Sequence, residues 1–156
     1  MNETSSSSAN RRVLRLDTYW PYQLTVLADR ISRRTAAIVK QHAELNLSQW
    51  RVMAAIAEQP GRTAGEVVNV TPMDKGIVSR ATKALLAAGL VVREASQGDG
   101  RISHLFLTEQ GDRVYAALLP HIEAVSHQEH AALSSAEREV FATCLSRLSG
   151  AIEVPR

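Results

Sequence analysis

Apolar residues near the start of the chain recur in steps of three and four, the spacing of an amphipathic helix. The apolar positions are Trp20, Leu24, Leu27, Ile31 and Ile38. This pattern predicts one long helix over residues 17–43, capped by Asp17 or Thr18. Pro21 then falls in the first turn, where a missing N–H is tolerated because that group has no helical partner. An earlier start would instead require a kink at Pro21.

Three shorter helices are predicted next, over residues 48–59, 63–70 and 73–88. The first two are expected to be capped by Ser48 and Thr63. A proline or a glycine follows each of the three segments and ends it.

The pattern then changes from helical spacing to alternation. LVVREASQ is rich in β-branched residues, and ISHLFLT alternates apolar and polar positions. Between them stands Gly98-Asp99-Gly100, a sequence typical of a tight turn. These features predict a β-hairpin.

Two helices are predicted to complete the chain. Thr108 is expected to cap the first, which contains Pro120 as a kink or a break. Ser134 begins the second, with Glu137 three residues later as a capping box. The predicted fold is mainly α with a small hairpin, a winged helix-turn-helix flanked by long terminal helices.

The expected organisation has four parts. A disordered tail (1–16) precedes an N-terminal dimerisation helix (17–46), a winged helix-turn-helix domain (47–112) and C-terminal dimerisation helices (113–156). Dimerisation is expected because the apolar stripes of the terminal helices exceed what a small winged core can cover. In the last helix these positions are Val140, Phe141, Leu145 and Leu148.

Composition narrows the class of protein. One cysteine excludes an internal disulfide framework, and no run reaches the roughly 18 apolar residues of a membrane span. The chain also lacks a phosphate loop, a nucleophile motif and a carboxylate pair beside a histidine. These observations predict a cytoplasmic protein that is not an enzyme and carries no cofactor or bound metal.

Because the net charge is only +2, the total charge does not indicate a nucleic-acid partner. Any such partner must be inferred from where the charged residues lie. At about 100° per residue, one face of the fourth predicted helix holds Val78, Ala81, Thr82 and Leu85. The opposite face holds Lys75, Gly76, Ser79, Arg80 and Lys83. Arg80 suits a guanine edge or a phosphate, and the lysines suit phosphates. The alternative is a solvated helix face.

The predicted hairpin tip offers a second basic group. Arg101 follows the glycine turn, and an arginine there can enter a narrow minor groove of DNA. Asp99 can hold the guanidinium in a fixed pose.

These segments resemble the MarR-type transcriptional regulators over residues 18–120. LSQWRVMAAIAEQPGRTAGEVV resembles the family's second and third helices, and MDKGIVSRATKALLAAGLVVRE its recognition helix and first wing strand. DGRISHLFLTEQG matches the wing signature of Asp-x-Arg followed by Leu-Thr-x-x-Gly. Unlike many members, this chain has Gly98 and Gly100 where basic residues would extend the wing tip.

The resemblance implies a homodimeric repressor or activator, with repression the expected role, that binds a palindromic operator and responds to a small ligand or an oxidant. The expected DNA contacts are Thr63, Lys75, Gly76, Ser79, Arg80, Lys83, Asp99 and Arg101. The runner-up function is a winged-helix protein-interaction module without DNA binding.

The ligand expected from the resemblance is a small aromatic or phenolic acid. Its pocket would lie where the first two helices meet the winged domain, with flat apolar walls and a group that orients a carboxylate. The expected lining residues are Tyr19, Trp20, Tyr22, Trp50, Met53 and Met73, with Arg30 or Arg51 as carboxylate partner. Alternatively, Trp20, Trp50 and Met53 are core.

Two other groups of residues could act as sensors, but a simpler role is expected for each. Cys144, between apolar neighbours, is expected to be a buried structural thiol rather than an oxidant sensor. His121, Glu123, His127 and His130 lack a third ligand of clear spacing. They are therefore interpreted as a solvated or dimer-contact face rather than a metal site.

Overall fold

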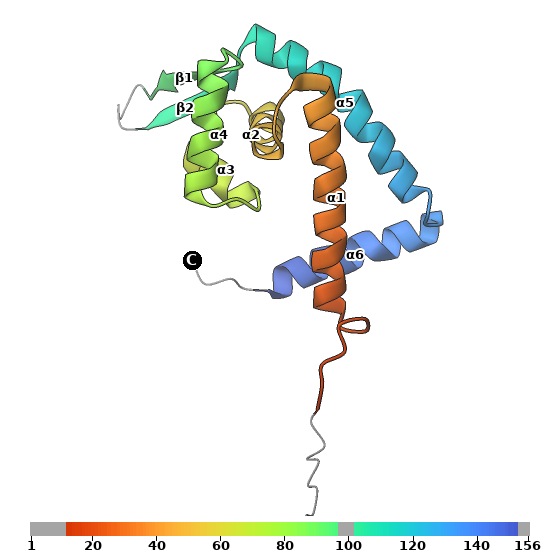
Figure 1. The fold of residues 1–156 in the computed structure, drawn as a ribbon. Helices are drawn as coiled ribbons and strands as arrows, with labels where there is room; N and C mark the ends of the chain where they lie inside the picture. The colour runs from red at the N-terminus through yellow and green to blue at the C-terminus, as the bar shows by residue number, and fades with distance from the viewer. Residues whose placement is uncertain (1–11, 97–101, 153–156) are drawn as a thin grey trace, which may run out of the picture.

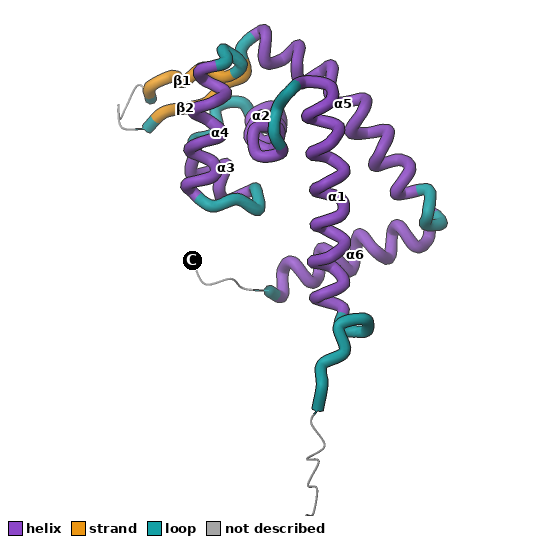
Figure 2. The backbone as a smooth tube through the Cα atoms, viewed as in Figure 1, coloured by secondary structure: helices purple, strands orange, loops and turns teal. Residues whose placement is uncertain are grey.

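The computed structural model describes residues 12–96 and 102–152 and is mainly helical with a small hairpin, as predicted (Figure 1). Its elements are α1 (Trp20–Ala43), α2 (Leu47–Glu58), α3 (Ala64–Val70), α4 (Lys75–Ala87), β1 (Val91–Ala95), β2 (Ser103–Leu107), α5 (Glu109–His130) and α6 (Ser135–Ala151). We call α2, α3, α4 and the β1–β2 hairpin the winged unit. Figure 2 shows the hairpin at one edge of this unit, while α1 and α5 extend away from it and α6 runs back from the far end of α5.

The start of α1 differs from the prediction. The helix begins at Trp20 with Tyr19 as a cap that offers no side-chain bond, so neither Asp17 nor Thr18 caps it. Pro21 lies in the first turn, as expected.

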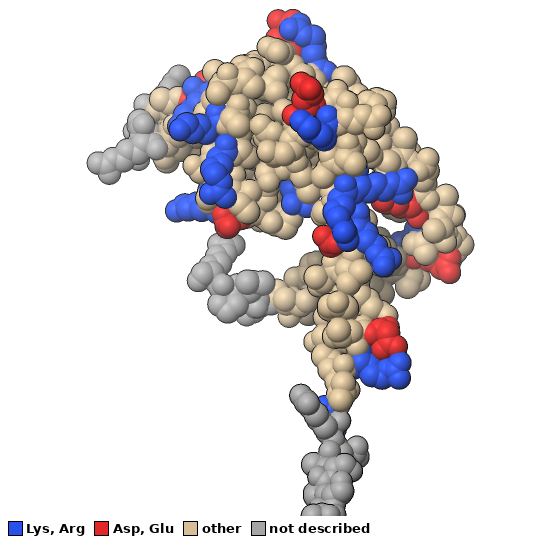
Figure 3. All heavy atoms as spheres, viewed as in Figure 1, with Lys and Arg blue, Asp and Glu red and all other residues tan. Residues whose placement is uncertain are grey.

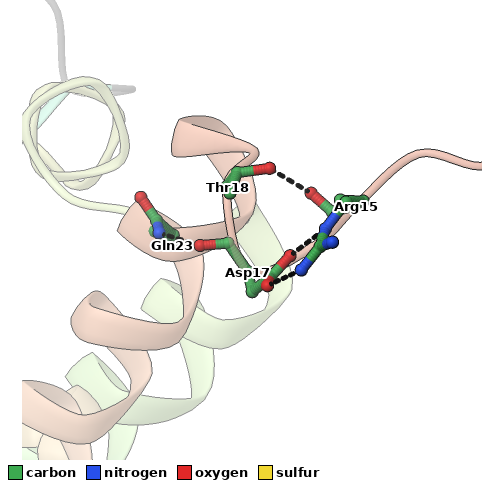
Figure 4. Close-up of polar contacts among 4 residues, drawn as sticks. All are labelled: Arg15, Asp17, Thr18 and Gln23. Carbon is green, nitrogen blue, oxygen red and sulfur yellow. Dashed lines mark hydrogen bonds and ion pairs between the residues drawn. The ribbon is translucent and has the colours of Figure 1, made fainter.

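Asp17 and Thr18 instead belong to a turn that precedes α1 (Figure 4). The Arg15 guanidinium donates to both carboxylate oxygens of Asp17, at 3.2 and 2.6 Å, and these bonds hold the pKa of Asp17 below its usual value. The backbone N–H of Thr18 donates to the Arg15 carbonyl at 3.3 Å, and the Gln23 amide donates to the Asp17 carbonyl. This turn joins Arg15, which the sequence placed in the tail, to the start of α1.

The cap of α2 is also displaced. Asn46, not Ser48, caps the helix, because its side chain accepts from the Gln49 N–H at 2.9 Å and Gln49 reaches back to the Asn46 N–H at 2.8 Å. At the other end, Arg62 is nearly buried and donates to the Ala55 carbonyl at 2.7 Å.

The remaining helix starts agree with the sequence within two residues. Thr63, Thr108 and Ser134 cap α3, α5 and α6 as predicted, and Asp74 caps α4. Pro120 lies inside α5 without ending it, since the helix runs on to His130.

The hydrophobic core lies in the winged unit and the adjoining parts of α1 and α5. Its largest fully buried side chains include Met53, Ile56, Leu85, Leu105 and Leu118. From α1 only Val39 is fully buried, and α6 buries no residue. The α1 stripe around Trp20 and the α6 apolar positions are therefore on the surface of the single chain, because these segments extend beyond the winged unit.

Among the glycines that the structure describes, Gly111 has the closest backbone neighbour. It is buried in the first turn of α5, and an added Cβ would fall on the Leu90 carbonyl oxygen and crowd the Leu107 side chain. The same Leu90 carbonyl accepts the Thr108 N–H at 3.1 Å. The absence of a side chain at Gly111 is what allows α5 to begin directly against the hairpin.

Thr82 carries a polar atom that the core does not satisfy. Its side chain is 1% exposed, and its hydroxyl has no partner among the described residues. The Thr82→Val variant is expected to raise the free energy of unfolding by about 1 kcal/mol, because it removes an unsatisfied hydroxyl at nearly constant shape. Urea unfolding measures this gain.

Thr71→Val is the matched control for that experiment. The Thr71 hydroxyl donates to the Val67 carbonyl at 2.7 Å, so its removal is expected to destabilise the protein. A loss of stability in Thr82→Val as large as that in Thr71→Val would contradict the assignment.

Candidate nucleic-acid interface

Helix α4 divides into a buried face and an exposed face as its sequence predicts. It packs against α2 and α3 with Val78, Ala81, Thr82 and Leu85 buried. The residues on its exposed side are Lys75, Gly76, Ser79, Arg80 and Lys83. Helix α4 therefore presents a short, polar and basic surface to solvent.

Local contacts fix the start of this surface. The Asp74 carboxylate accepts the Ile77 N–H at 2.7 Å and so determines where α4 begins. A Cβ added at Gly76 would lie 3.4 Å from the Arg80 guanidinium, which shows that Arg80 extends back along the helix over Gly76. The glycine leaves room both for this guanidinium and for close approach of a partner.

Arg93 on β1 adds a cation that the sequence reasoning missed. It stands beside Lys75, Gly76 and Ser79 in a cavity of about 460 Å³ between α3, α4 and the hairpin. The full lining is Ala64, Gly65, Val68, Lys75, Gly76, Val78, Ser79, Thr82 and Arg93. The clue in the sequence is an arginine among the β-branched residues of LVVREASQ, a pattern that predicts a strand but gives Arg93 no neighbour.

The cations of this surface are free of acidic partners in the part of the chain that the structure describes. Within residues 12–96 and 102–152, Lys75, Arg80, Lys83 and Arg93 form no salt bridge. Figure 3 shows Lys and Arg side chains gathered on the side of the winged unit that α4 and the hairpin form. We call Lys75, Ser79, Arg80, Lys83 and Arg93 the basic face. The charges of its lysines and arginines are available to an anionic partner.

Thr63 is engaged in capping α3. Its hydroxyl accepts the Glu66 N–H at 3.2 Å, and its own N–H donates to the Glu66 carboxylate at 2.7 Å. The Thr63 hydroxyl also donates to the Glu66 carboxylate, at 2.9 Å. The bond from the backbone N–H and then this bond from the hydroxyl hold the pKa of Glu66 below its usual value. Thr63 also lines a second hollow of about 430 Å³ beside Arg93. Asp99 and Arg101, the predicted wing-tip pair, lie outside the described residues.

The predicted ligand residues are not brought together within one chain. Trp50, Met53 and Met73 are buried core, whereas Tyr19, Trp20 and Tyr22 are 41–48% exposed. Trp20 is therefore not a core residue, although a core position was the alternative to ligand binding that the sequence suggested for it. About 28 Å of helix separates Trp20 from Val39, where α1 joins the core.

Two of the expected ligand residues do share a surface hollow. Trp50 and Arg51 line a space of about 360 Å³ with Val70, Thr71 and Pro72 of the α3–α4 segment. Arg51 donates to the Ser32 hydroxyl at 3.0 Å, and Trp50 stacks on Tyr115 of α5 with ring centres 5.3 Å apart. Arg30 is exposed on α1.

The histidines weighed as metal ligands and the cysteine are on the surface. His121 stacks on His42 of α1 with ring centres 3.7 Å apart, and His127 and His130 are exposed. Within the described ranges no cluster of three or more His, Cys, Asp or Glu is arranged to hold a metal. Cys144 is exposed, not buried as expected, because α6 packs on no other element over that position in the single chain.

None of the helices in the described residues is both long and apolar enough to cross a membrane.

A capped helix-turn-helix with an exposed basic second helix, followed by a hairpin, is the architecture of a winged helix-turn-helix regulator.

Comparison with known proteins agrees with this class. The family model of the MarR family matches residues 43–102. The transcriptional regulator HosA of Escherichia coli O127:H6 is 32% identical over 114 residues, which cover 70% of this chain and 81% of HosA. The chain belongs to the MarR family of transcriptional regulators and is not an enzyme.

Solved structures show the same fold over most of the chain. A MarR-family regulator from Silicibacter pomeroyi is 28% identical, with a TM-score of 0.75 over 93% of this chain and 99% of that one. BpsR of Bordetella bronchiseptica, whose DNA binding is regulated by 6-hydroxynicotinic acid, is 25% identical, with a TM-score of 0.68 over 81% of this chain and 98% of BpsR.

Proposed function

We propose that this chain binds a palindromic DNA operator as a homodimer, represses transcription, and is modulated by a small aromatic acid. The observation that carries the proposal is the basic face, whose cations are exposed and unpaired among the described residues. Arg80 is suited to a base edge, while Lys75, Lys83 and Arg93 are suited to phosphates. Such a protein acts in the cytoplasm, where its DNA is.

The apolar surface supports the homodimer. In the described residues, twelve large apolar side chains of the segment before α1, of α1, and of α6 with its C-cap are each 39–73% exposed. They are Val13, Leu14, Leu16, Tyr19, Trp20, Tyr22, Leu27, Ile31, Val140, Phe141, Leu145 and Ile152. So many exposed large apolar side chains are typical of a surface that a partner chain covers. We therefore assign the predicted ligand residues Tyr19, Trp20 and Tyr22 to the dimer surface.

A two-fold dimer also explains how a chain of net charge +2 would bind DNA. Two copies of the basic face at a fixed spacing would contact the two halves of a palindrome, and the second contact is intramolecular once the first has formed.

The hollow beside Trp50 and Arg51 is the better candidate for an effector site. Its lining includes Trp50 and the Arg51 guanidinium, which suit the ring and the carboxylate of an aromatic acid, and the Glu58 carboxylate in the same lining is paired with Arg62. BpsR, whose DNA binding responds to 6-hydroxynicotinic acid, supports this class of effector.

Selection of random DNA duplexes by the wild-type chain tests the proposal. We expect the enriched sequence to be palindromic and the affinity to fall linearly with salt on logarithmic axes, with a slope of about −0.9 per phosphate contacted. Fluorescence anisotropy of the selected duplex measures both, and 6-hydroxynicotinic acid in the same assay is expected to weaken binding. Failure to enrich any sequence, or an affinity that does not change with salt, would refute DNA recognition.

A further inference from the structure

Strand β2 is held along both of its edges. On one edge it pairs with β1 from Val91↔Leu107 to Ala95↔Ser103. On the other edge it bonds to the loop between α2 and α3. The Gly61 N–H donates to the Leu105 carbonyl at 2.9 Å, and the Leu105 N–H donates to the Arg62 carbonyl at 3.0 Å. A bridge between Thr63 and His104 extends this pairing to the cap of α3.

His104 adds a side-chain bond to this second edge. Its Nδ1 lies 2.7 Å from the Gly61 carbonyl oxygen. Because a carbonyl oxygen only accepts, Nδ1 must carry the hydrogen. Phe106, two residues along the same strand, packs so closely that a Cβ at Gly61 would lie 3.3 Å from its ring. Gly61 has a φ of +86°, so the side chains of β2 contact a turn that only glycine adopts easily.

These contacts connect His104 to the basic face through Leu105. Arg93 on β1 is paired in register with Leu105, the residue that exchanges both backbone bonds with the loop. The loop continues into Thr63 and α3, whose Ala64 and Gly65 face Arg93 across the cavity beside α4. The position of the hairpin against the loop therefore sets where Arg93 stands relative to Lys75 and Ser79.

We propose that His104 is a positioning residue for DNA binding. Its bond to Gly61 fastens the hairpin to the α2–α3 loop and holds Arg93 beside the exposed side of α4. His104 contacts no DNA in this arrangement; it acts through Arg93. This inference rests on the proposed DNA-binding function.

The test compares three variants on the duplex selected by the wild-type chain. His104→Leu removes the donor, His104→Asn keeps an N–H₂ near the position of Nδ1, and Arg93→Ala removes the group that is positioned. We expect His104→Leu to lower the affinity about tenfold, since a dimer loses one ordinary hydrogen bond in each of two hairpins. His104→Asn should stay within about twofold of wild type.

A double-mutant cycle separates positioning from a general loss of stability. In the Arg93→Ala background, His104→Leu is expected to have little further effect, because the two residues act as one unit. Amide hydrogen exchange at Gly61 and Leu105 should be faster in His104→Leu than in wild type, while exchange in the middle of α2 should be unchanged.

Each outcome decides the inference. Wild-type affinity in His104→Leu, an equal loss in His104→Asn, or full additivity with Arg93→Ala would overturn the positioning role. If the wild-type chain selects no DNA, the proposed function itself fails, and hydrogen exchange still reports whether His104 fastens the hairpin.

Discussion

The Arg80→Ala variant is expected to lose roughly 100-fold in operator affinity, because a dimer would contact the operator through two copies of this side chain. Arg80 is exposed in the middle of α4, has no acidic partner in the described residues, and extends along the helix over Gly76. For the same reasons the free energy of unfolding should change by no more than about 0.5 kcal/mol. Anisotropy titration of the selected duplex and urea unfolding measure the two quantities.

Arg33→Ala provides the matched control for Arg80→Ala. Arg33 is also an exposed helical arginine, but it lies on α1 and is paired with Asp29 at 2.5 Å. We expect its substitution to leave operator affinity within about twofold of wild type. Equal losses in the two variants would mean that net charge, and not the α4 surface, determines binding.

The Gly111→Ala variant is expected to destabilise the protein by about 3 kcal/mol, because the added methyl group collides with backbone rather than with a movable side chain. The Leu90 carbonyl in its path is also the acceptor for the Thr108 N–H at the start of α5. Relief of the collision must therefore move α5 or the entry to β1. Urea unfolding measures the loss.

Gly150→Ala makes the same change on another helix. A Cβ at Gly150 meets nothing within 4 Å, so this variant should be neutral or more stable by up to about 1 kcal/mol. A Gly111→Ala protein as stable as Gly150→Ala would show that the α5 junction is not closely packed.

The sequence predicted those parts of the fold that local rules determine. Thr63, Thr108 and Ser134 cap helices because each has the side chain and spacing of a cap. The two faces of α4 follow from helical periodicity alone. The cap of α2 was misplaced although Asn46 with Gln49 forms the standard spacing of a capping box.

The parts of the fold and of the site that the sequence did not predict depend on contacts between distant segments. Nothing near Arg93 in the sequence indicates that β1 brings it beside Lys75, because that neighbourhood is created by the packing of α3, α4 and the hairpin. Likewise, the stripe through Trp20 predicts an apolar surface but not what covers it. Periodicity identifies a face, whereas its partner belongs to tertiary or quaternary structure.

Because α6 is exposed in the single chain, its folding is expected to depend on how much of the protein a cell contains. Its 17 residues bury none of their side chains in the single chain, so little tertiary packing supports the helix beyond its own cap. In the proposed dimer, the second copy supplies that packing, and helix formation becomes linked to association by mass action. Dilution would then loosen the C-terminal helix as well as separate the chains. The number of copies present would set both how many operators are occupied and how much of each polypeptide is ordered.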